Sequence, residues 1–175
     1  MELKRYIRSI KNYPKKGILF RDITTLLKNE RAFVNSINQI LKIAKKYKID
    51  KIAAIESRGF VFASVISYKL KKPFILLRKK NKLPSKKHSV NFRLEYGTST
   101  IEVHKDSIKK NDSVLIIDDL VATGGTAKAS AKLIEKSNGK VVAFIFVINL
   151  FDLGGSNDLI KKGYKVNSLM NFPGH

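Results

Sequence analysis

The chain has 175 residues, of which 43% are hydrophobic, which is enough for one well-buried core but not for two full domains. Cysteine is absent, which excludes a disulfide framework and any thiolate metal site, and the three histidines lie too far apart to form a ligand spacing by themselves. The formal net charge of +21 invites a nucleic-acid function, but lysines scattered along the chain without an aromatic ladder favour a solvated surface, so no specific nucleic-acid partner is expected.

The first residues lack the apolar core of a signal peptide, and no stretch approaches the ~18 apolar residues of a membrane span. We therefore expect a cytoplasmic protein with no membrane partner. The chain has no internal repeat, low-complexity linker or Pro/Gly-rich boundary, so we expect residues 1–175 to form a single domain.

Hydrophobic periodicity predicts helices that alternate with strands. An N-terminal amphipathic helix is predicted from Leu3, Tyr6, Ile7 and Ile10, and a second helix from a set with helical spacing after Asn29, namely Phe33, Val34, Ile37, Ile40, Leu41 and Ala44. The remaining predictions are a strand at 51–57, a buried helix at 59–70, a strand at 73–77, a basic loop at 78–92, a half-exposed strand at 98–104, a buried strand at 114–118, a helix at 126–137 and a long buried strand at 140–150. Continuous apolar strands between helices indicate an α/β fold with a mostly parallel sheet covered on both faces.

The segment "VLIIDDLVATGGTA" (114–127) carries the chemistry. Asp118 and Asp119 end a buried strand, where ligands bind in open α/β sheets. Gly124 and Gly125 let the backbone approach an anion, and the N–H groups from Thr123 to Thr126 lie at a helix N-terminus, which makes a phosphate cradle. Two carboxylates can each accept a hydrogen bond from a ribose hydroxyl, so together these groups indicate a ribose 5-phosphate site.

Two simpler interpretations compete with this one. The acidic residues could merely cap the next helix, or they could hold magnesium beside the phosphate loop of a nucleotide hydrolase. The second interpretation requires a Gly-x-x-x-x-Gly-Lys-Ser/Thr loop, and neither that loop nor Gly-x-Gly-x-x-Gly occurs in the sequence.

The same segment resembles the phosphoribosyl-pyrophosphate signature of the type I phosphoribosyltransferases. Further stretches are similar to the adenine-specific members of that family: "YPKKGILFRDITTLL" (13–27), "ESRGFVFA" (56–63), "RKKNKLP" (78–84), "LEYGT" (94–98), "INLFDLGG" (148–155) and the closing "FPGH". The resemblance implies a central mostly parallel sheet flanked by helices, a small hood to which residues 1–28 contribute, and a flexible loop. It also implies the purine-salvage reaction of adenine with phosphoribosyl pyrophosphate to give AMP and pyrophosphate, with Mg²⁺ as cofactor and a homodimer as the assembly.

The resemblance assigns the site residue by residue. The ribose-phosphate group would be held by Asp118, Asp119, Ala122, Thr123, Gly124, Gly125 and Thr126. Pyrophosphate would be held by Ser57, Arg58, Arg78, Lys79 and Lys82, and adenine by Leu19, Phe20, Arg21 and Leu120. Glu95 matches the family's acid/base residue, and Asp118 and Asp119 would hold the metal indirectly, through ribose hydroxyls or water. A cis peptide bond between Glu56 and Ser57 is also implied.

Two departures from the family pattern fall near the loop, where Lys80-Asn81 replaces the usual Pro-Gly and Phe92 replaces a tyrosine. Two alternatives remain beside adenine transfer. A transferase for another purine base would be expected to carry a different segment from "GILFRD". A non-catalytic regulator that binds phosphoribosyl pyrophosphate would have no need of Glu95, Arg58 and Arg78.

Overall fold

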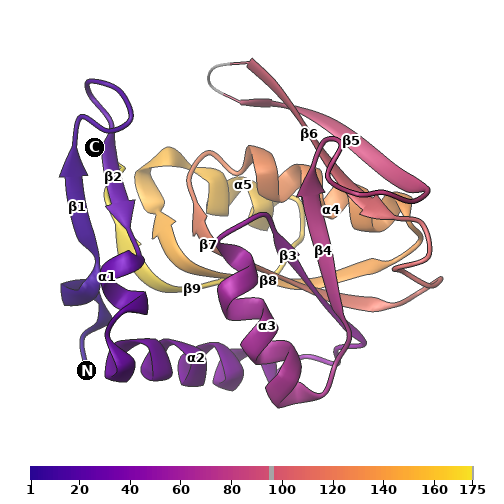
Figure 1. The fold of residues 1–175 in the computed structure, drawn as a ribbon, viewed down its shortest axis with the longest axis horizontal. Coiled ribbons are helices and arrows are strands. Elements are labelled where there is room, and N and C mark those ends of the chain that lie inside the picture. Colours follow the sequence, from indigo (N-terminus) through magenta and orange to yellow (C-terminus); the bar gives the residue numbers. More distant parts are fainter. Residues whose placement is uncertain (95–96, 175) are drawn as a thin grey trace.

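A computed structural model describes residues 1–94 and 97–174 and centres on a seven-stranded sheet (Figure 1). The strand order is β5-β6-β4-β3-β7-β8-β9. The strands are β3 (Lys51–Ile55), β4 (Phe74–Lys79), β5 (Lys87–Leu94), β6 (Gly97–His104), β7 (Ser113–Val121), β8 (Lys140–Leu150) and β9 (Val166–Phe172). From β4 to β9 neighbouring strands pair in parallel, whereas β6 pairs antiparallel with β4 and with β5. The parallel strands therefore end at one common edge of the sheet.

Helices cover both faces of the sheet and divide the core into two clusters. One cluster takes its buried side chains from α2 (Glu30–Ala44) and α3 (Gly59–Leu70), and the other takes them from α4 (Gly125–Lys136) and α5 (Gly155–Lys161). The strands between them are apolar on both faces, which is why they appear as continuous hydrophobic runs in the sequence. Within the described residues, no helix is both long enough and apolar enough to cross a membrane.

The second predicted helix is confirmed as α2. Asn29 is its N-cap, and the side chain of Asn29 accepts a hydrogen bond of 3.0 Å from the Ala32 N–H. The buried positions Ile37 and Ile40 lie on the predicted apolar face, whereas Val34 is exposed. The predictions for 59–70, 126–137 and 140–150 are likewise confirmed, with boundaries that agree within one residue.

The predicted N-terminal helix is wrong. Residues Leu3–Tyr6 form only a short 3-10 helix (η1), and Arg8–Lys11 form strand β1, which pairs antiparallel with β2 (Leu19–Asp22). Pairing with β2 overrides the helical spacing, because the chain reverses direction between Asn12 and Gly17. Both residues have a positive φ, and the Asn12 side chain accepts a hydrogen bond from the Gly17 N–H. This hairpin and the short α1 (Thr24–Leu27) lie at one end of the molecule, beside the C-terminus (Figure 1).

The predicted basic loop at 78–92 is also partly wrong. β4 extends to Lys79, and residues from Lys87 onward form β5, which pairs with β6 along its whole length. Lysines at the start of β5 hide the alternation of Val90 and Phe92, which pack against the core. The β5–β6 hairpin packs on α4, where Lys136 Nζ donates a hydrogen bond of 3.1 Å to the Ser89 carbonyl. The sequence analysis made no prediction for α5, β9 or the short 3-10 helix η2 (Phe151–Leu153).

Candidate active site

A cleft of about 510 Å³ lies where the parallel strands end. Its walls come from the end of β3, the end of β7, the N-terminus of α4 and the inner side of the β5–β6 hairpin. Eleven of the predicted site residues line it: Ser57, Arg58, Lys79, Asp118, Asp119, Leu120, Ala122, Thr123, Gly124, Gly125 and Thr126. The structure therefore brings the predicted ribose-phosphate residues and part of the predicted pyrophosphate residues into one cavity.

The two adjacent carboxylates lie at the floor of the cleft. Asp119 is only 4% exposed, and its Oδ2 lies 2.8 Å from Arg58 Nε. The N–H direction does not fit a hydrogen bond, and this Oδ2 is one of the few buried side-chain atoms in the described chain without a hydrogen-bond partner. Burial and the neighbouring Asp119 raise the pKa of Asp118 well above its ordinary value, and burial also raises the pKa of Asp119 against the opposing effect of Arg58. The pair therefore has unused acceptor capacity and gains from any donor or cation that enters.

The N-terminus of α3 approaches this pair closely because residue 59 is a glycine. A Cβ on Gly59 would lie 2.9 Å from Asp118 Oδ1 and 2.9 Å from the Ile117 carbonyl oxygen. Sequence analysis quoted this glycine within "ESRGFVFA" but gave it no role. Its absent side chain lets Arg58, the residue before it, reach Asp119.

The phosphate cradle is the turn that leads from β7 into α4. Gly124 is the N-cap of α4 and has φ +76°, a conformation that glycine adopts without strain. The first N–H groups of a helix have no acceptor within the helix, so those of Gly125 to Ala127 face the cleft as donors. The backbone of Gly155 packs directly against this turn: its N–H donates a hydrogen bond of 3.0 Å to the Ala122 carbonyl.

Glu56 organises the predicted pyrophosphate residues. The peptide bond between Glu56 and Ser57 is cis, as the family resemblance implied. The Glu56 carboxylate accepts hydrogen bonds from Arg78 Nε at 3.3 Å and from the Lys79 N–H at 3.0 Å. Burial tends to raise the pKa of Glu56, but these donors hold it below its ordinary value. Arg78 also donates a hydrogen bond of 3.0 Å to the Lys82 carbonyl, so Arg78 supports the loop that follows β4. Within the described chain, neither Arg78 nor Lys82 is among the residues that line the cleft.

Of the predicted adenine residues, Leu120 lies on β7 and lines the cleft, whereas Leu19, Phe20 and Arg21 lie on β2 and are not among its lining residues in the described chain. The centroids of the Phe20 and Tyr13 rings are 5.2 Å apart, and the two rings make an edge-to-face contact. Arg58 Cζ lies 5.4 Å from the centroid of the Phe20 ring. Phe20 is thus connected through Arg58 to Asp119. The Arg21 guanidinium points towards the C-terminal segment, where Nη2 donates a hydrogen bond of 2.8 Å to the Pro173 carbonyl. Burial lowers the pKa of Arg21. Any contact of Arg21 with a base would therefore come from its backbone.

Glu95, the predicted acid/base residue, lies outside the described residues. The sequence analysis assigned no site role to the other residues that line the cleft, which are Ile55, Glu56, Leu77, Phe92, Ser99, Thr100, Ile101, Val121 and Ala127. Ser99, Thr100 and Ile101 belong to the strand predicted at 98–104, but the sequence pattern gave no sign that this strand faces the cleft. Their position over the cleft depends on how the hairpin packs on α4, which the local sequence does not encode.

The carboxylate pair fits a divalent cation only in part. Among the described residues, no group of three or more His, Asp or Glu side chains could hold a metal ion. Mg²⁺ is commonly bound by one or two carboxylates together with substrate oxygens and water. The acceptor left unpaired on Asp119 agrees with such an arrangement.

Comparison with known proteins agrees with this geometry. Residues 22–169 match the phosphoribosyl transferase domain. The chain therefore belongs to the phosphoribosyltransferase family.

Relatives within this family are adenine phosphoribosyltransferases, as the resemblance indicated. The protein of that name from Pelagibacter ubique (strain HTCC1062) is 74% identical over 175 residues, which is 100% of both chains. The crystal structure of adenine phosphoribosyltransferase from Thermoanaerobacter pseudethanolicus is 46% identical, with a TM-score of 0.93 and 98% of each chain covered. The Saccharomyces cerevisiae enzyme, solved with an imino-altritol bisphosphate and adenine, is 32% identical, with a TM-score of 0.87 and 97% of each chain covered.

Proposed function

We propose that this chain transfers the 5-phosphoribosyl group of phosphoribosyl pyrophosphate to adenine, forming AMP and pyrophosphate in purine salvage. The observation that carries the proposal is one cleft that combines two adjacent carboxylates, of which Asp119 is buried, with a helix N-terminus. The first suits the two ribose hydroxyls and the second suits the 5-phosphate. The relative at 74% identity carries the name of this activity.

In the reaction, the bond from ribose C1 to pyrophosphate breaks while a bond from adenine N9 to C1 forms. Positive charge develops at C1 and the ring oxygen, and negative charge develops on pyrophosphate. Asp118 and Asp119 hold the ribose hydroxyls and place negative charge near the sugar. Arg58 and Lys79, which line the cleft, stabilise the departing pyrophosphate. As N9 bonds to C1, adenine loses the proton that its reactive tautomer carries on N7, and Glu95 is the proposed acid/base residue that accepts it.

Strand β2 is suited to recognise the base through its backbone. It pairs with β1 in a two-stranded sheet, so its other edge carries N–H and C=O groups that the sheet does not use. Adenine presents a donor at N6 and an acceptor at N1, whereas hypoxanthine presents the opposite pair. We propose that backbone groups between Leu19 and Arg21 match adenine, that Phe20 stacks on it, and that Leu120 contacts it from the cleft wall.

Mg²⁺ is the proposed cofactor, held by Asp118 and Asp119 through ribose hydroxyls or water. When bound, it would neutralise part of the pyrophosphate charge. Cytoplasmic localisation and the absence of a specific nucleic-acid partner belong to the same proposal.

A homodimer is the proposed assembly. Exposed apolar side chains on α3 and the neighbouring β4 support it, with Tyr68 80% exposed, Leu76 39% and Val61 38%. Sedimentation equilibrium at micromolar concentration measures the assembly, and a monomer mass would contradict this part of the proposal.

The deciding experiment is a competition between adenine and hypoxanthine at one concentration of phosphoribosyl pyrophosphate and Mg²⁺. Each mismatched hydrogen-bonding group costs roughly 1–3 kcal/mol, so adenine should be preferred by ~10² to 10⁴ in kcat/KM. Comparable turnover of both bases would indicate the alternative of a broader purine transferase. Binding of phosphoribosyl pyrophosphate without release of pyrophosphate, whichever base is added, would indicate the non-catalytic regulator.

A further inference from the structure

Glu102 is a buried carboxylate that the proposed mechanism does not use. It lies on β6 and is only 3% exposed, although the residues just before it on the strand, Thr100 and Ile101, line the cleft. A carboxylate with so little access to water must be satisfied by protein donors. Its donors come from Asn81, in the connection between β4 and β5, and from Lys87 and Ser89 at the start of β5.

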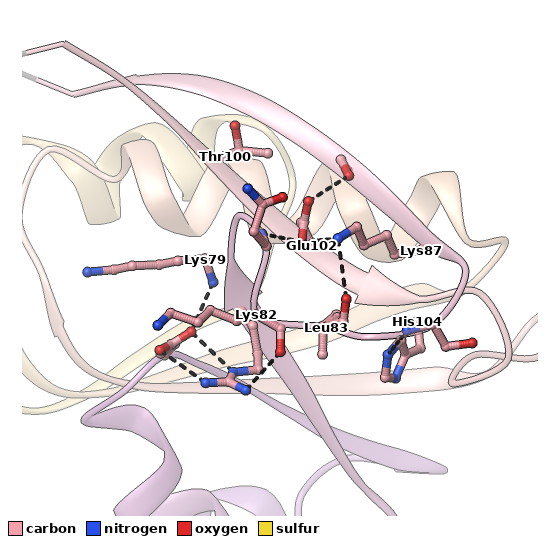
Figure 2. A network of polar contacts seen from close by, with 12 residues as sticks. Lys79, Lys82, Leu83, Lys87, Thr100, Glu102 and His104 are labelled. Atoms are coloured by element: carbon pink, nitrogen blue, oxygen red, sulfur yellow. Dashed lines mark hydrogen bonds and ion pairs between the residues drawn. The ribbon is translucent and has the colours of Figure 1, made fainter.

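Three groups converge on Glu102, as Figure 2 shows for the labelled Lys87. Lys87 Nζ lies 3.1 Å from Oε2, and the Asn81 N–H donates a hydrogen bond of 3.0 Å to the same oxygen. The Ser89 hydroxyl donates to Oε1 at 3.4 Å. Asn81 stands at the start of the connection from β4 to β5, Lys87 is the first residue of β5 where the connection ends, and Ser89 is the cross-strand partner of Glu102. Glu102 therefore ties both ends of this connection to the body of the sheet.

The connection needs such a tie because of its own charge. Lysines at positions 79, 80, 82, 86 and 87 repel one another, and Asn81 adopts a left-handed conformation with φ +65°. Lys87 Nζ also donates a hydrogen bond of 3.3 Å to the Leu83 carbonyl, inside the connection. Arg78 holds the Lys82 carbonyl from the other side. The turn that carries Lys79 and Lys82 is therefore held on one side by Glu56, through Arg78, and on the other side by Glu102.

We infer that Glu102 is a positioning residue for the pyrophosphate end of the cleft: it holds the lysine-rich turn in place so that its cations meet the leaving group. The inference rests on the proposed function, because the assignment of Lys79 to pyrophosphate belongs to it. Glu102 itself touches neither substrate, so its effect should appear only in the binding of the phosphorylated ligands.

The test is Glu102→Gln in the full-length protein. Glutamine keeps the size and one acceptor for the Asn81 N–H but removes the charge that holds Lys87. The KM for phosphoribosyl pyrophosphate and the inhibition constant of pyrophosphate should both rise about 10-fold, since misplaced cations weaken binding of the same group in both ligands. The KM for adenine should change less than about twofold. Glu135→Gln is the matched control, because it removes the charge from the carboxylate that accepts from the Tyr164 hydroxyl, away from the cleft, and should change neither KM.

Lys87→Gln provides a second route if Glu102→Gln does not fold. It removes the same ion pair from its more exposed side and should raise the same two constants. Equal changes in the KM of both substrates, or a lower melting temperature with unchanged constants, would show that Glu102 only stabilises the hairpin and would overturn the inference. Wild-type protein in the same assay distinguishes failure of the proposed function from failure of the inference about Glu102. Absence of turnover by the wild type would contradict the proposed function. Turnover by the wild type together with unchanged constants in the variant would contradict only the role of Glu102.

Discussion

Asp118 and Asp119 oppose stability and favour binding at the same time. Each has a raised pKa, so the folded protein retains protons that the unfolded chain releases. Stability contributed by the protonated pair is therefore present below the ordinary carboxyl pKa of 3.8 and is lost as the pH rises above it. Ionisation of the pair therefore costs folding free energy, and ribose hydroxyls or a cation that bind to it can offset this cost.

Replacing both residues by asparagine separates these two effects. Each charge-assisted hydrogen bond is worth roughly 1.5–3 kcal/mol, so the double variant should lose a factor of ~10² to 10⁴ in kcat/KM. The variant should also have a higher free energy of unfolding than the wild type, and this difference should be larger at pH 7 than at about pH 4. The wild type loses stability over this range as the pair ionises, whereas the variant has no such pair to titrate. Steady-state kinetics and urea unfolding at the two pH values measure both effects. Unaltered kinetics would remove the ribose assignment.

Gly155 supports the phosphate cradle without having a side chain. A Cβ at this position would lie 2.2 Å from the Ala122 carbonyl oxygen and 2.4 Å from the Gly124 nitrogen, so the turn would have to move. Gly155→Ala should lower kcat/KM for phosphoribosyl pyrophosphate by ~10- to 100-fold, since a small displacement of a binding group has effects of this size. Gly154→Ala is the control, because Gly154 has φ +75° but no atom within 4 Å of an added Cβ. Equal kinetics of the two variants would show that backbone strain, rather than the cradle, explains any loss.

At the scale of elements, Asp22 joins strand β2 to helix α1. Its carboxylate accepts hydrogen bonds from the Thr24 N–H at 2.9 Å and from Arg8 Nε at 3.0 Å. These hydrogen bonds lower the pKa of Asp22 from 3.8 to about 2. The Thr24 N–H has the largest effect, and together with Arg8 it outweighs burial, which acts in the opposite direction. The carboxylate therefore stabilises the hairpin that carries the proposed base-binding segment.

Asp22→Asn should lower the free energy of unfolding at pH 7 by roughly 2 kcal/mol or less, which is the value that this pKa shift allows. A lowered folded-state pKa contributes stability above the ordinary carboxyl pKa, and the contribution is lost as the pH falls towards 2. The difference between variant and wild type should therefore shrink between about pH 5 and pH 3 in denaturant titrations. Asp158→Asn, which removes an exposed ion pair with Lys128, is the control and should have little effect at any pH. A constant difference for Asp22→Asn across the range would contradict the linkage.

At the scale of the whole molecule, the net charge of +21 acts on one substrate only. Phosphoribosyl pyrophosphate carries several negative charges, and adenine is neutral at pH 7. A strongly positive protein raises the local concentration of an anionic ligand, and salt screens this attraction. The lysine-rich surface therefore has a functional consequence that does not require nucleic acid.

Raising the ionic strength from about 0.05 M to about 0.5 M at fixed free Mg²⁺ should increase the KM for phosphoribosyl pyrophosphate by roughly 3- to 10-fold. The KM for adenine should stay within about twofold over the same range, because no long-range charge attracts a neutral base. Parallel increases of both constants would indicate a general effect of salt on the enzyme instead of steering.

The sequence alone determined the features that depend on local pattern. Helix α2 was predicted because its apolar stripe and its Asn29 cap lie within one continuous segment, and β7 because its apolar run ends in two carboxylates. The ribose-phosphate residues from Asp118 to Thr126 were predictable for the same reason, since strand, turn and helix N-terminus follow one another directly. The phosphoribosyltransferase family followed from motifs of this contiguous kind, and the comparisons confirm it.

Only the tertiary structure decided which distant segments meet. The apolar spacing of the first ten residues predicted a helix, but pairing with β2 makes the chain from Arg8 onward a strand, because ladder hydrogen bonds outweigh weak local propensity. The lysines of 79–87 gave no sign of the buried Glu102 that holds them, and "INLFDLGG" gave no sign that Gly155 packs on Ala122. These contacts join residues far apart in the chain, and their energies depend on burial and on distances of a few ångströms, neither of which exists until the sheet has formed.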